Sequence, residues 1–187
     1  LHRYCRQNKI PYKIQYIPDP VAWTECPESL AVLGRQRTRW QRGLTEVLFR
    51  HIGMLFNPRY GRIGMVVFPY FFFLEMLGSL IELAGYIAFI LTVLLANVSS
   101  LFVVAFLTVA FVLGTVLSLI SIALEELTFR RYPRFQDMLQ LFGLCFLESF
   151  GYRQIQSYWR VKGVFQALMR NQEWGRMDRK GFQKEPL

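Results

Sequence analysis

The chain has 187 residues, of which 53% are hydrophobic and 16% aromatic, and its formal net charge is +9. A positive mean hydropathy alongside so many charges favours a membrane protein over a soluble globular domain. Residues 63–129 contain no Lys or Arg, whereas residues 1–62 and 130–187 contain 11 each. Because positive residues concentrate in cytoplasmic loops, both flanks of the apolar middle are predicted to be cytoplasmic.

The first 26 residues are predicted to be the C-terminal remnant of a cytoplasmic α/β domain. Residues 1–8 have the pattern of the end of an amphipathic helix, and residues 12–17 alternate as a β-strand does. The prolines at positions 18 and 20 would end this strand with a turn, and residues 21–25 could form a second strand. Together these elements resemble the last pieces of an α/β domain, so we expect its main sheet to lie upstream.

Residues 28–52 are predicted to form an amphipathic helix within an interfacial region that covers residues 27–62. Pro27 and Glu28 suit the first turn, where no N–H is needed and the helix dipole favours a negative charge. Apolar residues recur at helical spacing, with arginines at the edges of the apolar stripe. Such a helix is expected to lie flat at the cytoplasmic face of the membrane.

The middle of this helix, from Arg35 to Gly43, reads Arg-Gln-Arg-Thr-Arg-Trp-Gln-Arg-Gly. Gln36, Arg39, Trp40 and Gly43 are three and four residues apart and would share one helix face. A guanidinium matches the oxygens of a diphosphate, and an indole offers a flat apolar plane to a sugar ring. This face could therefore hold an anionic sugar nucleotide. The simpler alternative is a basic, aromatic helix that lies on anionic lipid.

The order Gln-x-x-Arg-Trp, formed by Gln36, Arg39 and Trp40, follows the run from Tyr16 to Ser29 and precedes long apolar segments. In this arrangement the motif resembles the signature of processive, membrane-embedded family 2 glycosyltransferases. These enzymes are the relatives of cellulose, hyaluronan, chitin and poly-N-acetylglucosamine synthases. The resemblance implies that Arg39 binds the donor diphosphate, that Trp40 stacks on the acceptor sugar and that Gln36 steadies the acceptor end.

The same resemblance implies a GT-A-type domain whose catalytic carboxylates, and whose bound Mg²⁺ or Mn²⁺, lie upstream of Leu1. The aspartates of this chain are Asp19, Asp137 and Asp178, and none is part of a paired-carboxylate motif. Three widely spaced cysteines and two isolated histidines form no metal-ligand cluster or disulfide framework. We therefore expect no catalytic residue and no metal ligand in this chain, and no activity from it alone.

Residues 63–129 are predicted to contain two transmembrane helices. Met65–Ala96 lacks positive charge and would be about 48 Å long as a helix, against a hydrocarbon core of about 30 Å. Pro69 and the aromatic residues after it predict an interfacial segment or kink, so the span itself is expected over 74–96. After a short external turn, residues 101–124 are expected to form the second span.

Four carboxylates accompany these spans. Glu125 and Glu126 stand at the cytoplasmic boundary, where solvated or snorkelling side chains are common. Glu75 and Glu82 are inside the apolar region, and Glu82 is the deeper of the two. A carboxylate at that depth is costly unless it faces a polar interior. Glu82 could therefore line a sugar-translocation path or pack against a further helix.

Residues 130–172 are predicted to form helices that dip into the membrane or lie at its surface. The apolar run 138–150 is too short to cross, and a third crossing would place the later positive charges outside. We expect one helix over 135–151 and a second over 152–171, so that the chain returns to the cytoplasmic side.

The tail, residues 173–187, resembles the gating loop that closes over the nucleotide in the same glycosyltransferase family. Trp174 matches the aromatic position of that loop. Arg179 matches its basic position, where the side chain would also contact the donor diphosphate. Met177 stands where Ser or Thr is common. A disordered basic tail is the alternative.

The predicted fold is a mainly α membrane protein: a remnant of a GT-A-type α/β domain, interfacial amphipathic helices, two transmembrane helices and a membrane-dipping helix pair. The predicted function is the C-terminal membrane part of an inverting glycosyltransferase. It would transfer sugar from a nucleotide-sugar donor, such as a UDP-sugar, to a growing β-linked polysaccharide and help to form its channel. The protein would be integral to the inner or plasma membrane, with both ends of this chain cytoplasmic.

Two other classes of protein stay open. One is a non-catalytic membrane anchor or assembly subunit that binds anionic lipid through its basic helices. The other is a transporter subunit that uses Glu82, although the chain shows no internal repeat of the kind common in transporters. A nucleic-acid partner is not expected, because lipid headgroups account for basic residues beside membrane spans.

Overall fold

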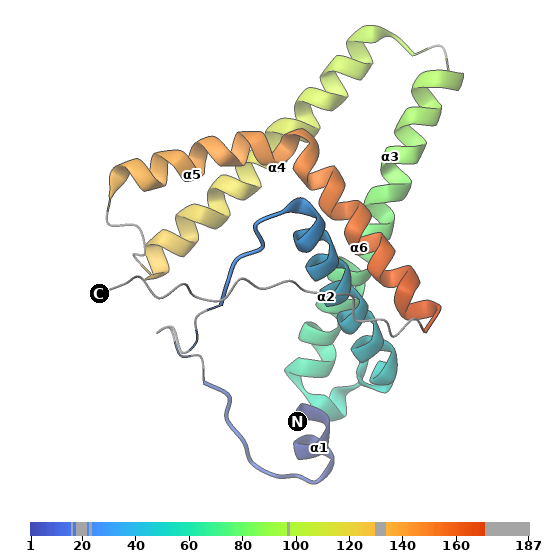
Figure 1. The fold of residues 1–187 in the computed structure, drawn as a ribbon. Coiled ribbons are helices and arrows are strands. Elements are labelled where there is room, and N and C mark those ends of the chain that lie inside the picture. The colour runs from blue at the N-terminus through green and yellow to red at the C-terminus, as the bar shows by residue number, and fades with distance from the viewer. Residues whose placement is uncertain (16, 18–21, 23, 97, 130–133, 171–187) are drawn as a thin grey trace. The chain divides into compact units, whose positions relative to one another are not determined.

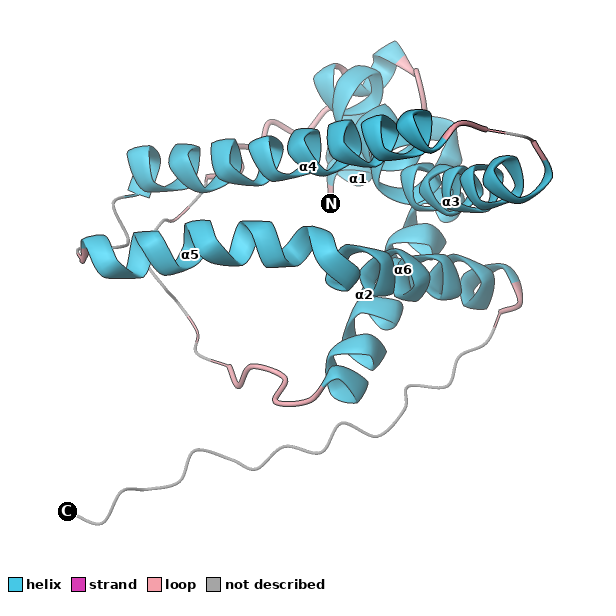
Figure 2. Ribbon diagram, turned by 90° about the horizontal axis from the view of Figure 1, so that it is seen from above, coloured by secondary structure: helices cyan, strands magenta, loops and turns pink. Residues whose placement is uncertain are grey.

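The structure is a computed structural model that describes residues 1–15, 17, 22, 24–96, 98–129 and 134–170. Its described part consists of helices and loops, as Figure 2 shows by colour. The α-helices, labelled in Figure 1, are α1 (His2–Gln7), α2 (Leu30–Arg50), α3 (Gly78–Leu95), α4 (Ser100–Phe129), α5 (Phe135–Leu147) and α6 (Arg153–Leu168). Short 3₁₀ turns form η1 (Ile52–Met54) and η2 (Pro58–Tyr60), and π-helical segments form η3 (Ile63–Val67), η4 (Tyr70–Leu77) and η5 (Glu148–Tyr152).

The helix expected within residues 1–8 is present as α1, but the two predicted strands are not seen. The described residues of 12–17 and of 21–25 have no regular structure. An alternating sequence becomes a strand only when a neighbouring backbone supplies partners for its N–H and C=O groups. No such neighbour exists among the described residues. The assignment of residues 1–26 to a GT-A-type domain therefore stays a prediction.

Helix α2 confirms the helix predicted over residues 28–52, with one correction at its start, and its place at the membrane surface stays a prediction. Ser29 is the N-cap, with extended backbone angles of φ −130° and ψ 151°. Its Oγ accepts a hydrogen bond from the Val32 N–H at 3.3 Å, which satisfies a donor that the first turn leaves free. Pro27 and Glu28 therefore precede the helix instead of forming its first turn. Serine is a better N-cap than proline or glutamate because its short side chain reaches the backbone N–H three residues later.

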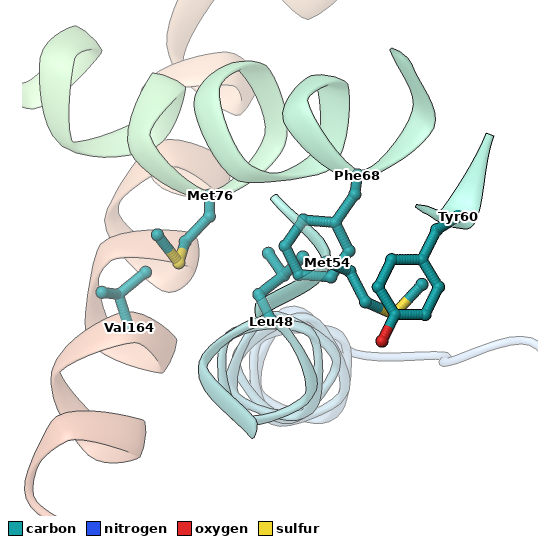
Figure 3. Close-up of a cluster of buried hydrophobic side chains, with 6 residues drawn as sticks. All are labelled: Leu48, Met54, Tyr60, Phe68, Met76 and Val164. Carbon is teal, nitrogen blue, oxygen red and sulfur yellow. The ribbon is translucent and has the colours of Figure 1, made fainter. Parts of the chain in front are cut away.

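The chain divides into two compact units: Leu1–Leu83 with the described residues from Ser157 onward, and Ala84–Gln156. The first unit has a small core in which side chains from α2, both 3₁₀ turns, the π-helical stretch and α6 meet (Figure 3). These buried residues are Leu48, Met54, Tyr60, Phe68, Met76 and Val164. Burial of such side chains contributes on the order of 1.5 to 3 kcal/mol each, so this core holds the 3₁₀ turns against α2.

Helices α2 and α6 approach each other closely at two glycines. A Cβ added at Gly163 on α6 would lie 2.5 Å from the Thr38 backbone oxygen and 2.8 Å from the Gln41 Cβ on α2. A Cβ added at Gly34 on α2 would lie 2.6 Å from the indole of Trp159 on α6. Glycine costs roughly 1 kcal/mol relative to alanine inside a helix. The close contact between the two helices offsets that cost.

The first predicted span is longer than expected, because the chain is helical from Ile63 to Leu95. Pro69, with φ −56° and ψ −42°, stands between the π-helical segments η3 and η4. A proline has no N–H and its ring crowds the preceding turn of an α-helix. Wider π turns are one way to keep such a residue within a helix. The predicted entry segment is therefore continuous with the span.

Two described helices are long and apolar enough to cross a membrane: Ile63–Leu95 with 33 residues and Ser100–Phe129 with 30. Only 6% and 11% of their most apolar windows are buried within the protein. This exposure fits helices that face lipid better than helices of a soluble core. Exposed phenylalanines, leucines and valines along α4 and the second half of α3 would be costly in water.

The second unit contains the first helix of the predicted pair and the start of the second helix. Helix α5 packs on α4. The ring centroid of Phe111, on α4, lies 4.7 Å from that of Phe150, in η5, and 6.5 Å from that of Phe146, on α5. Gly151 then breaks the helix with φ +88°, a left-handed conformation that glycine adopts without strain. The predicted break near residue 151 is therefore confirmed, and α6 begins at Arg153. Whether the pair enters the membrane stays a prediction.

Replacing Gly163 by alanine should lower the free energy of unfolding by about 1 to 3 kcal/mol, because the added methyl would collide with the α2 backbone. Denaturation of the detergent-solubilised protein, followed by circular dichroism, measures this loss. Gly143→Ala on α5 is the matched control, since a Cβ there meets nothing within 4 Å. It should be neutral or stabilising by up to about 1 kcal/mol. Equal effects of the two substitutions would contradict a tight contact between α2 and α6.

Candidate functional site

One face of α2 carries the residues of the predicted motif and remains accessible. Trp40 is 54% exposed, and Gln36 and Arg39 are partly exposed. A Cβ added at Gly43 would meet nothing within 4 Å, so the backbone is open at the end of this face. The spacing of three and four residues places these groups side by side on the helix. The structure therefore brings Gln36, Arg39 and Trp40 together as predicted from their spacing.

The opposite face of α2 is buried in the first unit. Its buried residues are Gly34, Thr38, Gln41, Arg42, Thr45 and Leu48. Because an α-helix has 3.6 residues per turn, burial at these positions places the motif residues on the opposite side of the helix. Packing thus fixes which way the motif points.

The indole of Trp40 has a cationic neighbour that its own motif does not include. The Arg37 guanidinium lies 5.0 Å from the ring centroid, within the range of a cation–π interaction. Arg37 Nε is buried and has no hydrogen-bond partner among the described residues. The spacing of three residues on a helix is the sequence signal for this pair. Arg37 was not predicted as a site residue because it is not part of the Gln-x-x-Arg-Trp motif. Arg37 is therefore an additional site residue.

The site is strongly basic. Four arginines lie within eight positions of α2: Arg35, Arg37, Arg39 and Arg42. Glu46 is the single carboxylate of the helix, and it lies 3.9 Å from Arg42 Nε. Arg42 is buried on the packed side, so this pair does little to neutralise the accessible face. The excess of positive charge suits a ligand that carries phosphate groups.

A polar network links α2 to η4 and α6 beneath this face. Arg160 Nη2 lies 3.1 Å from Glu75 Oε2 and also donates to the Glu75 backbone oxygen. Arg160 Nε donates to Gln41 Oε1 at 3.3 Å, and Gln41 Nε2 donates to the Glu75 backbone oxygen at 3.3 Å. Thr45 Oγ1 donates to the Gln41 backbone oxygen at 2.8 Å, and Tyr70 OH donates to Glu75 Oε1 at 3.4 Å. The network joins three helical elements at one point.

Sequence reasoning missed this network, although it identified Glu75 as a carboxylate within an apolar segment. The physical signal was present, because a carboxylate in such a segment needs a charged or polar partner. The partner could not be identified because Arg160 is 85 residues further along the chain. Gln41, which directly follows Trp40, also received no role. The structure gives both residues a part in positioning the motif helix.

Other predicted site residues are not brought together with this face. Trp174 and Arg179, assigned to a gating loop, lie outside the described residues. Glu82, on α3, is partly exposed, and its place on a translocation path stays a prediction. Within the described part of the chain, no group of three or more His, Cys, Asp or Glu side chains could hold a metal ion.

The cysteines take no part in the site. Cys26 is exposed, Cys5 and Cys145 are buried, and none forms a disulfide. Burial, and to a lesser degree the nearby Glu148 carboxylate, raise the pKa of the Cys145 thiol. A raised pKa keeps the sulfur protonated at neutral pH, and a protonated thiol is a poor nucleophile. Cys145 therefore behaves as a small apolar side chain.

Comparison with known proteins finds one informative similarity. The chain is similar to the probable glycosyltransferase YdaM of Bacillus subtilis (strain 168), with 27% identity over 151 residues. The matched region covers 80% of this chain and 34% of the relative, so the chain spans about a third of that protein's length. No family model matches the chain. No solved structure matches it.

Exchange of Arg160 for glutamine should destabilise the first unit more than exchange of Glu75 for glutamine. Arg160 also bonds Gln41 and a backbone oxygen, so its removal should cost about 1 to 2 kcal/mol. A double-mutant cycle should give a coupling of about 0.5 to 1 kcal/mol, because both side chains are partly solvated.

Chemical denaturation of the four proteins in detergent measures these free energies of unfolding. Lys162→Gln provides the control, since Lys162 is an exposed cation two residues further along α6. Its effect should stay within about 0.5 kcal/mol. Strict additivity of the two exchanges would show that the Arg160–Glu75 pair does not stabilise the fold.

Proposed function

We propose that this chain is the membrane part of an inverting family 2 glycosyltransferase that uses a nucleotide-activated sugar, such as a UDP-sugar, to extend a β-linked polysaccharide. The observation that carries the proposal is the accessible face of α2, on which Gln36, Arg39 and Trp40 stand together. Similarity to a probable glycosyltransferase over 80% of the chain supports the same class of enzyme. That similarity is general and does not identify the donor or the acceptor.

Each residue of the face has a proposed role that follows from its chemistry. Arg39 would bind the donor diphosphate, because a guanidinium presents a rigid fork of donors to phosphate oxygens. Trp40 would support the acceptor sugar, whose C–H face packs well on an indole. Gln36, one turn before Trp40, would hydrogen-bond the acceptor end. Arg37 would help to fix the plane of the indole through its cation–π contact.

The reaction also needs groups that the described residues do not supply. An acceptor hydroxyl becomes a better nucleophile when a carboxylate removes its proton. Mg²⁺ or Mn²⁺ would supply charge neutralisation for the diphosphate leaving group. The described residues offer no set of ligands for such an ion, so we place the metal site and the base in other parts of the enzyme. The chain spans about a third of its relative, which leaves room for such a domain.

The helical segments Ile63–Leu95 and Ser100–Phe129 would anchor this face at the membrane. In the proposed enzyme they help to form the channel through which the polymer leaves, with Glu82 as one candidate for its lining. Residues 173–187 would form the gating loop, with Trp174 and Arg179 closing over the nucleotide. The network of Arg160 and Glu75 supports this arrangement, because it connects the motif helix to the first of these helical segments.

The alternative of a non-catalytic membrane anchor makes different demands on α2. An anchor needs basic residues and an aromatic at the lipid surface, but not a particular guanidinium beside a particular indole. Exchange of Arg39 for lysine would preserve an anchor, because the positive charge is kept. A glycosyltransferase would lose the two-pronged contact with the diphosphate. The same substitution therefore separates the two functions.

In the full-length protein that contains this chain, Arg39→Lys should lower polymer synthesis by at least about a hundredfold, as expected for loss of a group that stabilises transition-state charge. Trp40→Ala should lower it by about tenfold or more through loss of the sugar platform. Membrane vesicles supplied with Mg²⁺ and either radiolabelled UDP-glucose or radiolabelled UDP-N-acetylglucosamine measure incorporation, and the active donor names the sugar.

Two matched variants control for charge and for exposed aromatic surface. Arg50→Lys makes the same exchange at the end of α2, and Tyr158→Ala removes an aromatic that is 59% exposed on α6. Both should keep activity within about twofold, since Arg50 lies about 15 Å along the helix axis from Trp40 and Tyr158 lies on α6. Wild-type activity from Arg39→Lys would refute the role of Arg39, and equal losses from Trp40→Ala and Tyr158→Ala would refute the platform.

The charge distribution predicts that both ends of the chain are cytoplasmic, because the apolar stretch of residues 63–129 separates two basic flanks. Reporter fusions after Leu187 test this orientation in a bacterial host. Alkaline phosphatase, which needs the oxidising periplasm, should be inactive there, and green fluorescent protein should fluoresce. Active phosphatase would place Leu187 outside and contradict the predicted orientation.

A further inference from the structure

A second basic site lies in the first unit, outside the motif face of α2. A hollow of about 790 Å³ opens between α1, the segment that follows it and the turn η2. Three cationic side chains line it: Arg6, Lys9 and Arg59. Two tyrosines, Tyr12 and Tyr60, contribute to its wall. No residue of the Gln-x-x-Arg-Trp motif takes part in this lining.

Among the described residues, no carboxylate neutralises the positive charge of this hollow. The two segments that build it, residues 1–15 and 51–62, contain six Lys and Arg residues and no Asp or Glu. No carboxylate in the described part of the chain forms an ion pair with a cation of the lining. Like charges gathered without counter-charges repel one another, and a bound anion would relieve that repulsion.

The local fold holds these cations in place. Lys9 has φ +54° and ends α1 with a left-handed turn, after which the Ile10 N–H donates to the Cys5 oxygen at 2.8 Å. This turn directs residues 10–12 back along α1. The Arg6 guanidinium carbon then lies 5.9 Å from the centre of the Tyr12 ring, within cation–π range.

Contacts with η2 complete the hollow. Gln7 Nε2 donates to Tyr60 OH at 3.1 Å, and Tyr60 is buried in the core of the first unit. Gly61 follows with φ +58°, and an added Cβ there would lie 3.7 Å from Arg6 Nη2. The hydroxyl of Tyr12 meets His2 Nδ1 at 2.7 Å. Hydrogen bonds between residues that are distant in the sequence therefore hold both walls of the hollow. The fold, and not only the sequence, brings these cations together.

We propose that this hollow binds a phosphate ester. Arginine side chains recognise phosphate through paired donors, and lysine adds a point charge. The volume is within the range of roughly 300 to 1,000 Å³ that small-molecule sites occupy, and it exceeds the size of a bare phosphate ion. The site therefore accommodates a phosphate attached to a larger group.

Two sources can supply this chemistry. The hollow ends at η2, and Ile63, three residues after Tyr60, begins the first helical segment that could cross a membrane. An anionic phospholipid headgroup at that level would place its phosphodiester beside Arg6 and Arg59. A soluble phosphomonoester is the other source. The two differ in whether the ligand carries acyl chains, and the test separates them on that basis.

The test measures binding to the purified full-length protein in neutral detergent by isothermal titration calorimetry. The probes are dihexanoyl phosphatidylglycerol, dihexanoyl phosphatidylcholine and glycerol 3-phosphate. The double variant Arg6→Gln/Arg59→Gln should weaken binding of phosphatidylglycerol or glycerol 3-phosphate, whichever binds, by about tenfold or more, because it removes both guanidinium contacts. Arg6→Lys/Arg59→Lys keeps the charge and should weaken it less. Circular dichroism verifies that each variant retains its helices.

The control variant Arg50→Gln/Lys162→Gln removes two exposed cations of the same unit and matches the net charge of the site variant. It should change affinity by less than about twofold. Site-dependent binding of phosphatidylglycerol without glycerol 3-phosphate identifies a lipid site, and site-dependent binding of glycerol 3-phosphate identifies a soluble ligand. Absence of binding to every probe, or equal losses in the site and control variants, would overturn the proposal.

This site is independent of the proposed transferase face. Trp40→Ala should leave phosphate-ester binding in the hollow unchanged, because the hollow and the motif face share no residue. If Trp40→Ala loses sugar transfer but retains phosphate-ester binding, the loss therefore arises at the transferase face and not at the hollow. Retained transfer with no site-dependent binding would remove only the inference about the hollow.

Discussion

The ion pair between Arg160 and Glu75 is the interaction on which the arrangement of the motif helix depends. A carboxylate within an apolar helical stretch is costly unless a partner compensates its charge. Arg160 reaches Glu75 from α6 and bonds the side chain of Gln41 on α2 as well. Three helical elements are therefore joined by polar contacts that apolar packing alone would not specify. Such contacts are directional, so they add to the packing of α2 a preference for one rotation of the helix.

That rotation has a functional consequence because α2 has two different faces. Gly34 and Thr38 belong to the packed face, where α6 comes within contact distance of the helix backbone. Trp40, 54% exposed, belongs to the other face. A motif that binds a ligand must be both accessible and held still. The glycine contacts and the polar network hold the helix from one side, and the residues proposed to bind sugar and diphosphate lie on the other side.

The basic residues of the first unit also divide into groups with separate uses. Arginines of α2 surround the proposed diphosphate site, whereas Arg6, Lys9 and Arg59 line a hollow near the start of the first candidate span. Both groups precede a stretch of 67 residues, 63–129, without Lys or Arg. The general rule of positive residues at the cytoplasmic membrane surface accounts for the total charge. It does not explain why Arg6, Lys9 and Arg59 lie around one hollow. Hydrogen bonds between residues that are distant in the sequence hold the walls of that hollow in place.

Sequence alone determined the features that depend on neighbouring residues: the helical period of α2, the break at Gly151, the two apolar stretches and the shared face of Gln36, Arg39 and Trp40. Local spacing is sufficient for these because a helix satisfies its own backbone. The predicted strand over 12–17 was wrong for its described residues, since a strand needs a partner that spacing does not reveal. Only the tertiary structure decided that Glu75 pairs with Arg160 and that Arg6 and Arg59 line one hollow. These residues are far apart in the chain, and folding brings them within reach of each other.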